Sequence, residues 1–155
     1  MIIFDKLSSE LKSKSLLSLL KFNRHFKAKL IISSQWLHDL LPESRKQIDL
    51  FLIFKGLSDK KLMDIHRDSD SSIPFDIFNE MYKKATQLPH SFFYVDTRLD
   101  EFRRNFDCKF IIRSKEDDGE NELSVYLLFN KTSLMLLRNQ ACITVMVVGD
   151  VLVEL

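Results

Sequence analysis

The sequence is poor in glycine and has no glycine-rich motif. Only three of its 155 residues are glycine, and none of Gly56, Gly119 and Gly149 is followed by Lys and then Ser or Thr. A phosphate-binding loop of the G-x-x-x-x-G-K-[ST] type needs that lysine and the glycines, because its backbone amides and ammonium group hold the phosphates. The sequence therefore excludes such a loop from these 155 residues.

Other scarcities exclude further classes of protein. The two cysteines, Cys108 and Cys142, are too few and too far apart for a zinc site or a disulfide framework. No apolar run reaches the roughly 18 residues that a membrane-spanning helix requires, so we expect no membrane partner. The formal net charge is +1, which gives no global reason for binding nucleic acid. The length fits one domain, and the 45% hydrophobic content can supply its core.

Short apolar runs alternate with helical patterns over residues 1–110. The runs predict buried strands, and the 3.6-residue spacing of apolar side chains between them predicts helices. The expected strands cover residues 2–5, 29–33, 49–54 and 92–96, and the expected helices cover residues 8–26, 36–47 with a break at Pro42, 58–66, and a stretch from Pro74 to Ala85. Apolar strands separated by helices predict an α/β fold with three layers, in which helices cover both faces of a mostly parallel sheet.

The pattern changes over residues 111–155. Lys115 to Glu122 is charged and contains a glycine, so we expect an exposed loop there. The apolar runs at 123–129, 134–137 and 143–155 predict strands or a hairpin against the sheet, unless they derive from an altered reading frame. We therefore divide the chain into residues 1–110 and a β-rich tail, residues 111–155.

Polar residues follow the first two expected strands. Asp5 ends the first strand, and Ser34 and Gln35 end the second. In a parallel sheet these side chains share the edge where ligands bind, so Asp5 could hold a magnesium-bound water beside the β- and γ-phosphates and Gln35 could sense the γ-phosphate. The structural alternatives are an aspartate that caps a helix and a polar strand end that caps the next helix.

Two basic residues bear on this interpretation. Arg24 could reach a phosphate of a neighbouring subunit and stabilise its charge in trans, although a solvated basic helix end is the structural alternative. Lys6 follows Asp5. Many ATPases that hold magnesium with an acid at the end of a strand carry a second acid at this next position, where it orients the attacking water. A lysine cannot act as that base at neutral pH.

Taken in order, these segments resemble the C-terminal half of the poxvirus-type genome-packaging ATPases of the FtsK–HerA superfamily. The resemblance covers roughly residues 1–110, and the ordered series carries it rather than any single motif. The matching segments are residues 2–5, 23–26, 30–35, 41–45, 51–55, 78–86 and 92–96.

The resemblance implies a partial RecA-like P-loop core of a motor that moves double-stranded DNA into a capsid, usually as a homo-oligomeric ring. ATP and Mg²⁺ would be its cofactors, and host cytoplasm (the viral factory) or the virion its location. Asp5 would be the magnesium-site acid acting through water, Gln35 the phosphate sensor, Arg24 the trans-acting finger, and Ser34 a residue beside the nucleotide. Because the phosphate-binding loop is missing, we expect a fragment or split half that is inactive alone and completes its site with a separately encoded N-terminal half.

Two other functions remain open at this stage. The chain could be a non-catalytic protein that keeps the family's subunit or capsid contacts, an interpretation that Lys6 favours. It could also be a phosphoacceptor receiver module, since Asp5, Ser33 or Ser34, and Lys55 end successive strands, although the acidic pair of an earlier strand is missing. An ATPase core that lacks the phosphate-loop strand and the helix after it leaves an exposed sheet edge and apolar face, which the Val-rich tail could cover in part.

Overall fold

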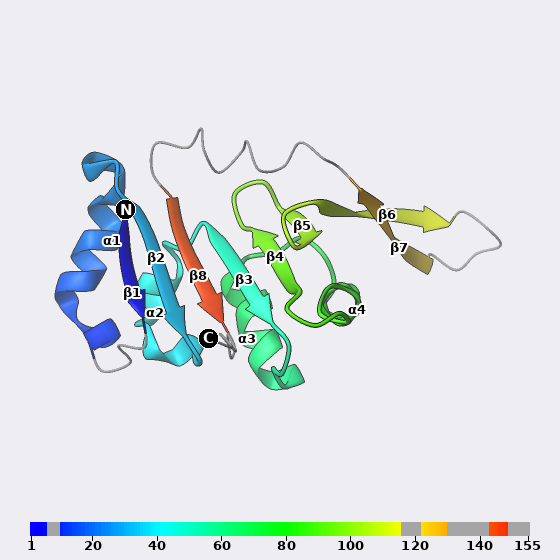
Figure 1. The fold of residues 1–155 in the computed structure, drawn as a ribbon, viewed down its shortest axis with the longest axis horizontal. Coiled ribbons are helices and arrows are strands. Elements are labelled where there is room, and N and C mark those ends of the chain that lie inside the picture. The colour runs from blue at the N-terminus through cyan, green and yellow to red at the C-terminus, as the bar shows by residue number, and fades with distance from the viewer. Residues whose placement is uncertain (6–9, 116–121, 130–142, 149–155) are drawn as a thin grey trace.

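The computed structural model describes residues 1–5, 10–115, 122–129 and 143–148 of the chain. Within these ranges one eight-stranded sheet packs against four α-helices, so the fold is of the α/β class (Figure 1). No helix in the described ranges is long and apolar enough to cross a membrane.

The elements follow in chain order. They are β1 (Ile2–Asp5), the 3-10 helix η1 (Glu10–Lys12), α1 (Lys14–Phe26), β2 (Lys29–Ser34), the 3-10 helix η2 (Leu37–Asp39), α2 (Pro42–Arg45), β3 (Leu50–Phe54), α3 (Asp59–Asp68), α4 (Phe75–Ala85), β4 (Phe92–Asp96), β5 (Glu101–Arg104), β6 (Cys108–Lys115), β7 (Glu122–Phe129) and β8 (Ile143–Val148).

The sheet is mixed, and the prediction of a mostly parallel sheet is wrong. The strand order is β1-β2-β8-β3-β4-β5-β6-β7, with parallel pairing from β1 to β3 and antiparallel pairing from β3 to β7. The direction changes at β4 because two helices, α3 and α4, separate it from β3. The first helix carries the chain to the amino edge of β3 and the second returns it, so β4 starts where β3 ends.

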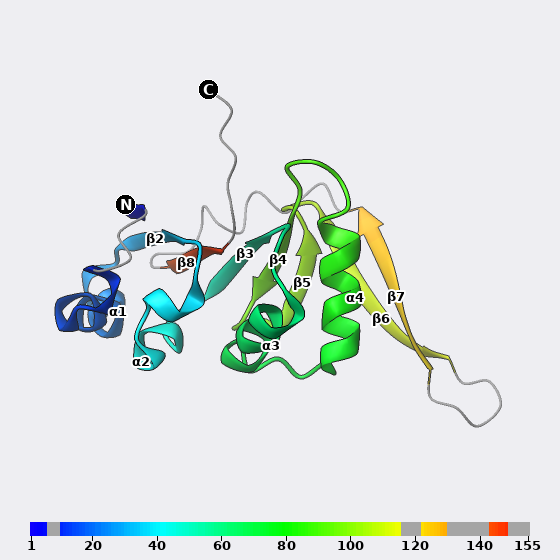
Figure 2. The same ribbon diagram turned by 90° about the horizontal axis from the view of Figure 1, so that it is seen from below.

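The described helices form a single layer, so the prediction of three layers is also wrong. All four α-helices lie on one face of the sheet (Figure 2). β1, β2 and β3 advance in one direction along the sheet, and crossovers of one hand that advance in one direction place their helices on the same face. β4 to β7 follow one another without intervening helices, so this half of the sheet supplies no helix to the second face.

Capping explains where α1 begins and ends. The Ser13 hydroxyl accepts a hydrogen bond from the backbone N–H of Leu16 at 3.2 Å, which satisfies one of the unpaired donors of the first turn. Lys27 adopts a left-handed conformation with φ 48° and ends the helix just before β2. Ser8 and Ser9, the predicted caps, lie outside the described residues. The predicted break at Pro42 is confirmed, because η2 and α2 are separate short helices.

The Val-rich segment of the tail lies inside the sheet. β8 pairs in parallel with β2 on one side and with β3 on the other, and Met146 and Val148 are buried in the main core. We expected this segment to cover an exposed edge or face of the sheet. Instead it forms an inner strand, β8, which connects two strands that do not pair with each other. The predicted boundary at residue 110 falls inside β6, and the predicted run at 134–137 and the loop residues 116–121 lie outside the described residues.

The two sides of the sheet carry unequal apolar clusters. The main core lies on the helix side, where Phe78 of α4 packs edge-on against Phe93 and Phe102 at ring-centroid distances of 5.1 and 5.9 Å. Edge-to-face packing of this kind is the favoured geometry of aromatic pairs. On the other side of the sheet Leu50, Tyr94 and Val145 form a smaller buried cluster.

The position of β8 predicts that alanine substitutions at two methionines change the free energy of unfolding by very different amounts. Met146→Ala should lower the free energy of unfolding by about 2–5 kcal/mol, because it deletes a fully buried side chain. Met63→Ala, at a side chain on α3 that is 52% exposed, should change it by less than about 0.5 kcal/mol. Urea unfolding of both variants measures this, and equal midpoints would contradict the insertion of β8.

Candidate functional site

The carboxyl ends of the parallel strands bring three of the predicted site residues to one edge of the sheet. Asp5 lies at the end of β1 and pairs in register with Ser33 of β2, and Ser34 and Gln35 follow directly. The carboxylate of Asp5 is exposed to solvent. An acid and an amide therefore stand at the ends of adjacent parallel strands, which is the edge where open α/β sheets bind ligands.

Ser34 is committed to local structure. Its side chain is buried, its hydroxyl donates to Asp39 Oδ2 at 2.5 Å, and the same oxygen accepts the backbone N–H of Trp36 at 3.2 Å. These two bonds hold the chain as it turns from β2 into η2. The hydroxyl also lies 3.1 Å from the carbonyl oxygen of Trp36, so both acceptors within its reach belong to the same turn. Ser34 therefore positions the Gln35 segment and does not offer a donor to a ligand in this conformation.

Gln35 borders a small cavity at the same edge. The cavity holds about 10 Å³, the size of one water molecule, and its other lining residues include Trp36, His38, Lys61 and Val148. The ammonium group of Lys61 lies 3.5 Å from the ring centroid of Trp36, a cation–π contact that fixes the indole over the start of α3. The end of β8 therefore reaches the surroundings of Gln35.

Tyr82 holds the turn after β3 at this edge. Its hydroxyl donates to the carbonyl oxygen of Phe54 and accepts the backbone N–H of Leu57, both at 3.1 Å. Burial raises the pKa of Tyr82 above the ordinary value for tyrosine, and the hydrogen bond from Leu57 opposes this only in part. The neutral phenol, which the bond to Phe54 requires, is therefore the stable form at physiological pH.

The other predicted site residues lie elsewhere. Arg24 is in the last turn of α1, which ends where β2 begins, so its backbone is at the opposite edge of the sheet from Asp5 and Gln35. The side chain of Arg24 and the whole of Lys6 lie outside what the structure describes. An arginine at this position cannot reach the site of its own subunit. The position agrees only with the predicted role in trans, at the site of a neighbouring subunit.

The inserted strand also separates Asp5 from Lys55. β2 and β8 both lie between β1 and β3, so the carboxylate and the ammonium group follow strands three steps apart, or about 14 Å at the usual strand spacing. A phosphoacceptor site needs these groups within ion-pair distance. The geometry therefore weighs against the receiver interpretation.

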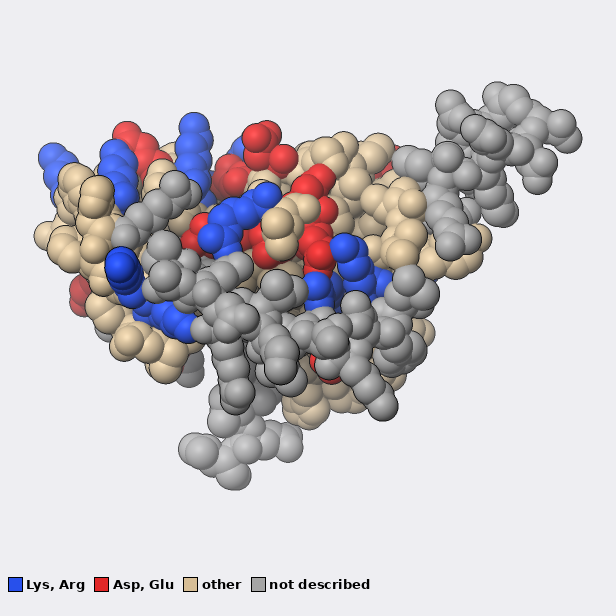
Figure 3. All heavy atoms as spheres, turned by 90° about the horizontal axis from the view of Figure 1, so that it is seen from above, with Lys and Arg blue, Asp and Glu red and all other residues tan. Residues whose placement is uncertain are grey.

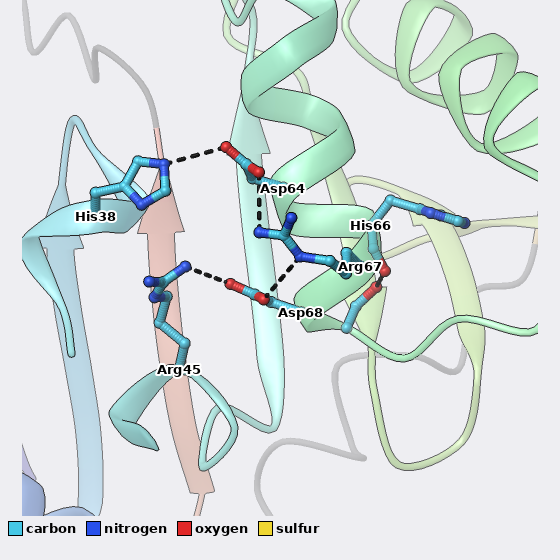
Figure 4. Close-up of polar contacts among 7 residues, drawn as sticks. His38, Arg45, Asp64, His66, Arg67 and Asp68 are labelled. Carbon is cyan, nitrogen blue, oxygen red and sulfur yellow. Dashed lines mark hydrogen bonds and ion pairs between the residues drawn. The ribbon is translucent and has the colours of Figure 1, made fainter. Parts of the chain in front are cut away.

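A network of charged side chains, absent from the sequence prediction, crosses the helix layer (Figure 4). His38 Nε2 lies 3.1 Å from Asp64 Oδ2, and Asp64 Oδ1 accepts from Arg67 at 2.9 Å. Arg67 Nε lies 3.7 Å from Asp68 Oδ1, and Asp68 Oδ2 accepts from Arg45 at 2.7 Å. The network joins η2 and α2, which follow β2, to α3, which follows β3. It therefore links on the helix side the same two parts of the sheet that β8 links within it.

A second hollow in the described part of the chain lies at the amino edge, away from Asp5. It is an open pocket of about 670 Å³ whose lining includes Lys46, Arg67, Asp68, Asp70 and Thr97. Basic and acidic side chains alternate over the described part of this edge and form no area of one sign (Figure 3). The pocket is therefore electrostatically mixed, and no single class of charged ligand matches its lining.

The described residues form no ready-made metal centre. No group of three or more His, Cys, Asp and Glu side chains among them could hold a metal ion. A single carboxylate such as Asp5 binds Mg²⁺ weakly, but Mg²⁺ commonly uses one or two carboxylates together with waters and substrate phosphates. Asp5 fits Mg²⁺ only in that second way, as one ligand acting with a nucleotide.

Comparison with known proteins gives no relative. No family model, no curated protein and no solved structure matches the chain. The function must therefore be inferred from the residues and the geometry.

The sequence carries a partial signal for this network. Asp64 lies in the predicted helix over residues 58–66, whereas Arg67 and Asp68, three and four residues further on, fall just beyond its predicted end and inside the observed α3. Three and four residues are the spacings at which side chains meet on a helix. The connection of these side chains to Arg45 depends on the packing of α2 against α3, which no local pattern reveals.

The network predicts unequal roles for its two arginines. Arg45→Met should lower the free energy of unfolding by about 3 kcal/mol, because Asp68 would lose the partner that is 8% exposed. Arg67→Met should lower it by less than about 1 kcal/mol, since that arginine is 66% exposed and shares the same aspartate. Urea unfolding of both variants gives the comparison, and an equal loss in the two would contradict a structural role for the buried pair.

Proposed function

We propose that the chain is one half of an ATP site in a viral genome-packaging motor, and that it does not hydrolyse ATP alone. It would supply Asp5 as the acid that holds Mg²⁺ through water and Gln35 as the sensor of the γ-phosphate. The phosphate-binding loop would come from a separately encoded N-terminal half. The core would then be a partial RecA-like P-loop domain.

One observation supports this proposal above the others. Asp5 and the Ser34–Gln35 pair end adjacent parallel strands at one edge of the sheet, and the carboxylate is open to solvent. A Mg²⁺–phosphate group placed at this edge can meet an acid from one strand and an amide from the next. These 155 residues contain no G-x-x-x-x-G-K-[ST] motif, so in this proposal the main phosphate contacts come from the other half.

The other parts of the proposal follow from the resemblance. The complete motor would act on double-stranded DNA and a capsid, as a homo-oligomeric ring in which Arg24 serves the site of a neighbouring subunit. It would work in the host cytoplasm, at the viral factory, or in the virion. The mixed charge of the amino edge gives that edge no preference for DNA, so the DNA contact would lie elsewhere.

A second candidate has its own support. Ser34 is tied to Asp39 and Trp36, and β8 places its end beside Gln35, so the edge is already filled with local contacts. This favours a non-catalytic protein that keeps subunit or capsid contacts after losing the chemistry. The two candidates differ in whether Mg²⁺–ATP touches Asp5.

Nucleotide binding to the isolated chain tests the first candidate. With ATP and Mg²⁺ at about 5 mM, the backbone amide signals of Asp5, Ser33 and Gln35 should shift in NMR spectra, because a site without its loop binds in the millimolar range. Asp5→Asn should abolish these shifts. Asp107→Asn, at an exposed carboxylate in the turn between β5 and β6, should leave them unchanged.

Phosphate release should stay at the level of buffer for the wild-type chain. A magnesium-dependent rate that Asp5→Ala abolishes would contradict the inactivity of the isolated half. If the NMR shifts are absent, or if they persist in Asp5→Asn, the proposed ATP site is contradicted and the non-catalytic candidate is favoured.

A further inference from the structure

Exposed apolar side chains gather at the β1–α1 end of the molecule. Ten large hydrophobic residues are exposed in the described ranges, and five of them lie on β1, α1 or next to them. Their exposed fractions run from 41% to 80%, and the five are Met1, Ile2, Ile3, Phe22 and Phe26. Figure 1 places β1 and α1 at the same end of the molecule. Apolar side chains grouped in this way mark an interaction surface more often than scattered ones do.

The backbone of β1 is open on the same side. Among the strands that the structure describes, β1 is at the edge of the sheet and pairs with β2 alone, so its outer N–H and C=O groups have no partner in the other described strands. Natural edge strands are usually protected by charged residues, proline or a bulge. Residues 1–4 contain neither a charged side chain nor a proline, so the protection that β1 has before Asp5 is its short length of four residues.

We propose that β1 pairs with β1 of a second copy of this chain, in antiparallel orientation across a two-fold axis. With the axis at Ile3, the two Ile3 side chains face each other and Ile2 faces Phe4 of the other copy. Only Asp5 meets a residue of different character, Met1, and it lies at the rim where its carboxylate stays in water. The strand is thus complementary to itself in this register, which is the requirement of a two-fold interface.

The helix layer adds to the same interface. A two-fold axis perpendicular to the sheet keeps the helices of both copies on one side, so the two α1 helices become neighbours. Phe22 and Phe26 are four residues apart and therefore project from one side of α1. Neither is part of the buried core of its own subunit, in contrast to Leu16 and Leu20 of the same helix. A strand this short with two aromatic residues buries less than a standard interface, so we expect micromolar association.

Sedimentation of the whole chain over a concentration series tests the proposal. The average mass should rise from monomer to dimer between about 5 and 500 µM, the range of weak interfaces. Ile3→Lys should raise the concentration of half-association at least tenfold, because two like charges would meet at the axis. Phe26→Ser should raise it by a smaller factor, and its thermal unfolding should match that of the wild type.

Met63→Lys is the matched control. Met63 is 52% exposed on α3, away from β1, so the same charge there should leave association unchanged. A wild-type chain that stays monomeric over the series would overturn the proposal. A dimer that persists in Ile3→Lys, or one that Met63→Lys weakens equally, would overturn it as well.

Discussion

The insertion of β8 between β2 and β3 is the interaction on which the rest of the structure depends. Without it, the described part of β1 and β2 would form a two-stranded unit, connected to the other strands through η2, α2, their ion pairs with α3 and the apolar core that they share. Two-stranded units are marginal in water because they bury too little apolar surface. β8 fills the gap with hydrogen bonds on both sides, and its Met146 and Val148 complete the core beneath the helices.

The same insertion shapes the candidate site. It keeps the ends of β1 and β2 together, so Asp5 remains beside Ser33, while it separates both from Lys55. It also brings Val148 to the cavity beside Gln35. A partner that supplies a phosphate-binding loop on a parallel strand would need to reach this edge, either at the open side of β1 or in place of β8. The proposed pairing between two copies of β1 would compete with the first of these routes.

Helices and strands could be predicted from the sequence where local patterns determine them. They could not be predicted where pairing with a distant segment determines them. Periodicity located α1, α4 and the strands at residues 29–34 and 50–54, and Pro42 marked a real break. β5, with the sequence Glu-Phe-Arg-Arg, has no apolar run and forms through pairing with β4 and β6. Likewise, the central place of β8 arises from contacts with β2 and β3 that neither composition nor spacing encodes. The contacts of Ser34 with Trp36 and Asp39 are local, and they agree with the alternative of a polar strand end that holds the start of the next helix. The edge that gathers Asp5, Ser34 and Gln35 was predictable, because it needs only parallel strands.

Hydrogen exchange of the backbone amides in residues 143–148 tests the central claim most directly. A strand bonded on both sides within the core should exchange as slowly as β2 and β3, since all three would open only with the global unfolding of the domain. We therefore expect protection in β8 equal to that of residues 30–34 and 50–54. Fast exchange of residues 143–148 beside slow exchange of β3 would contradict the account, because it would show a sheet that does not depend on this strand.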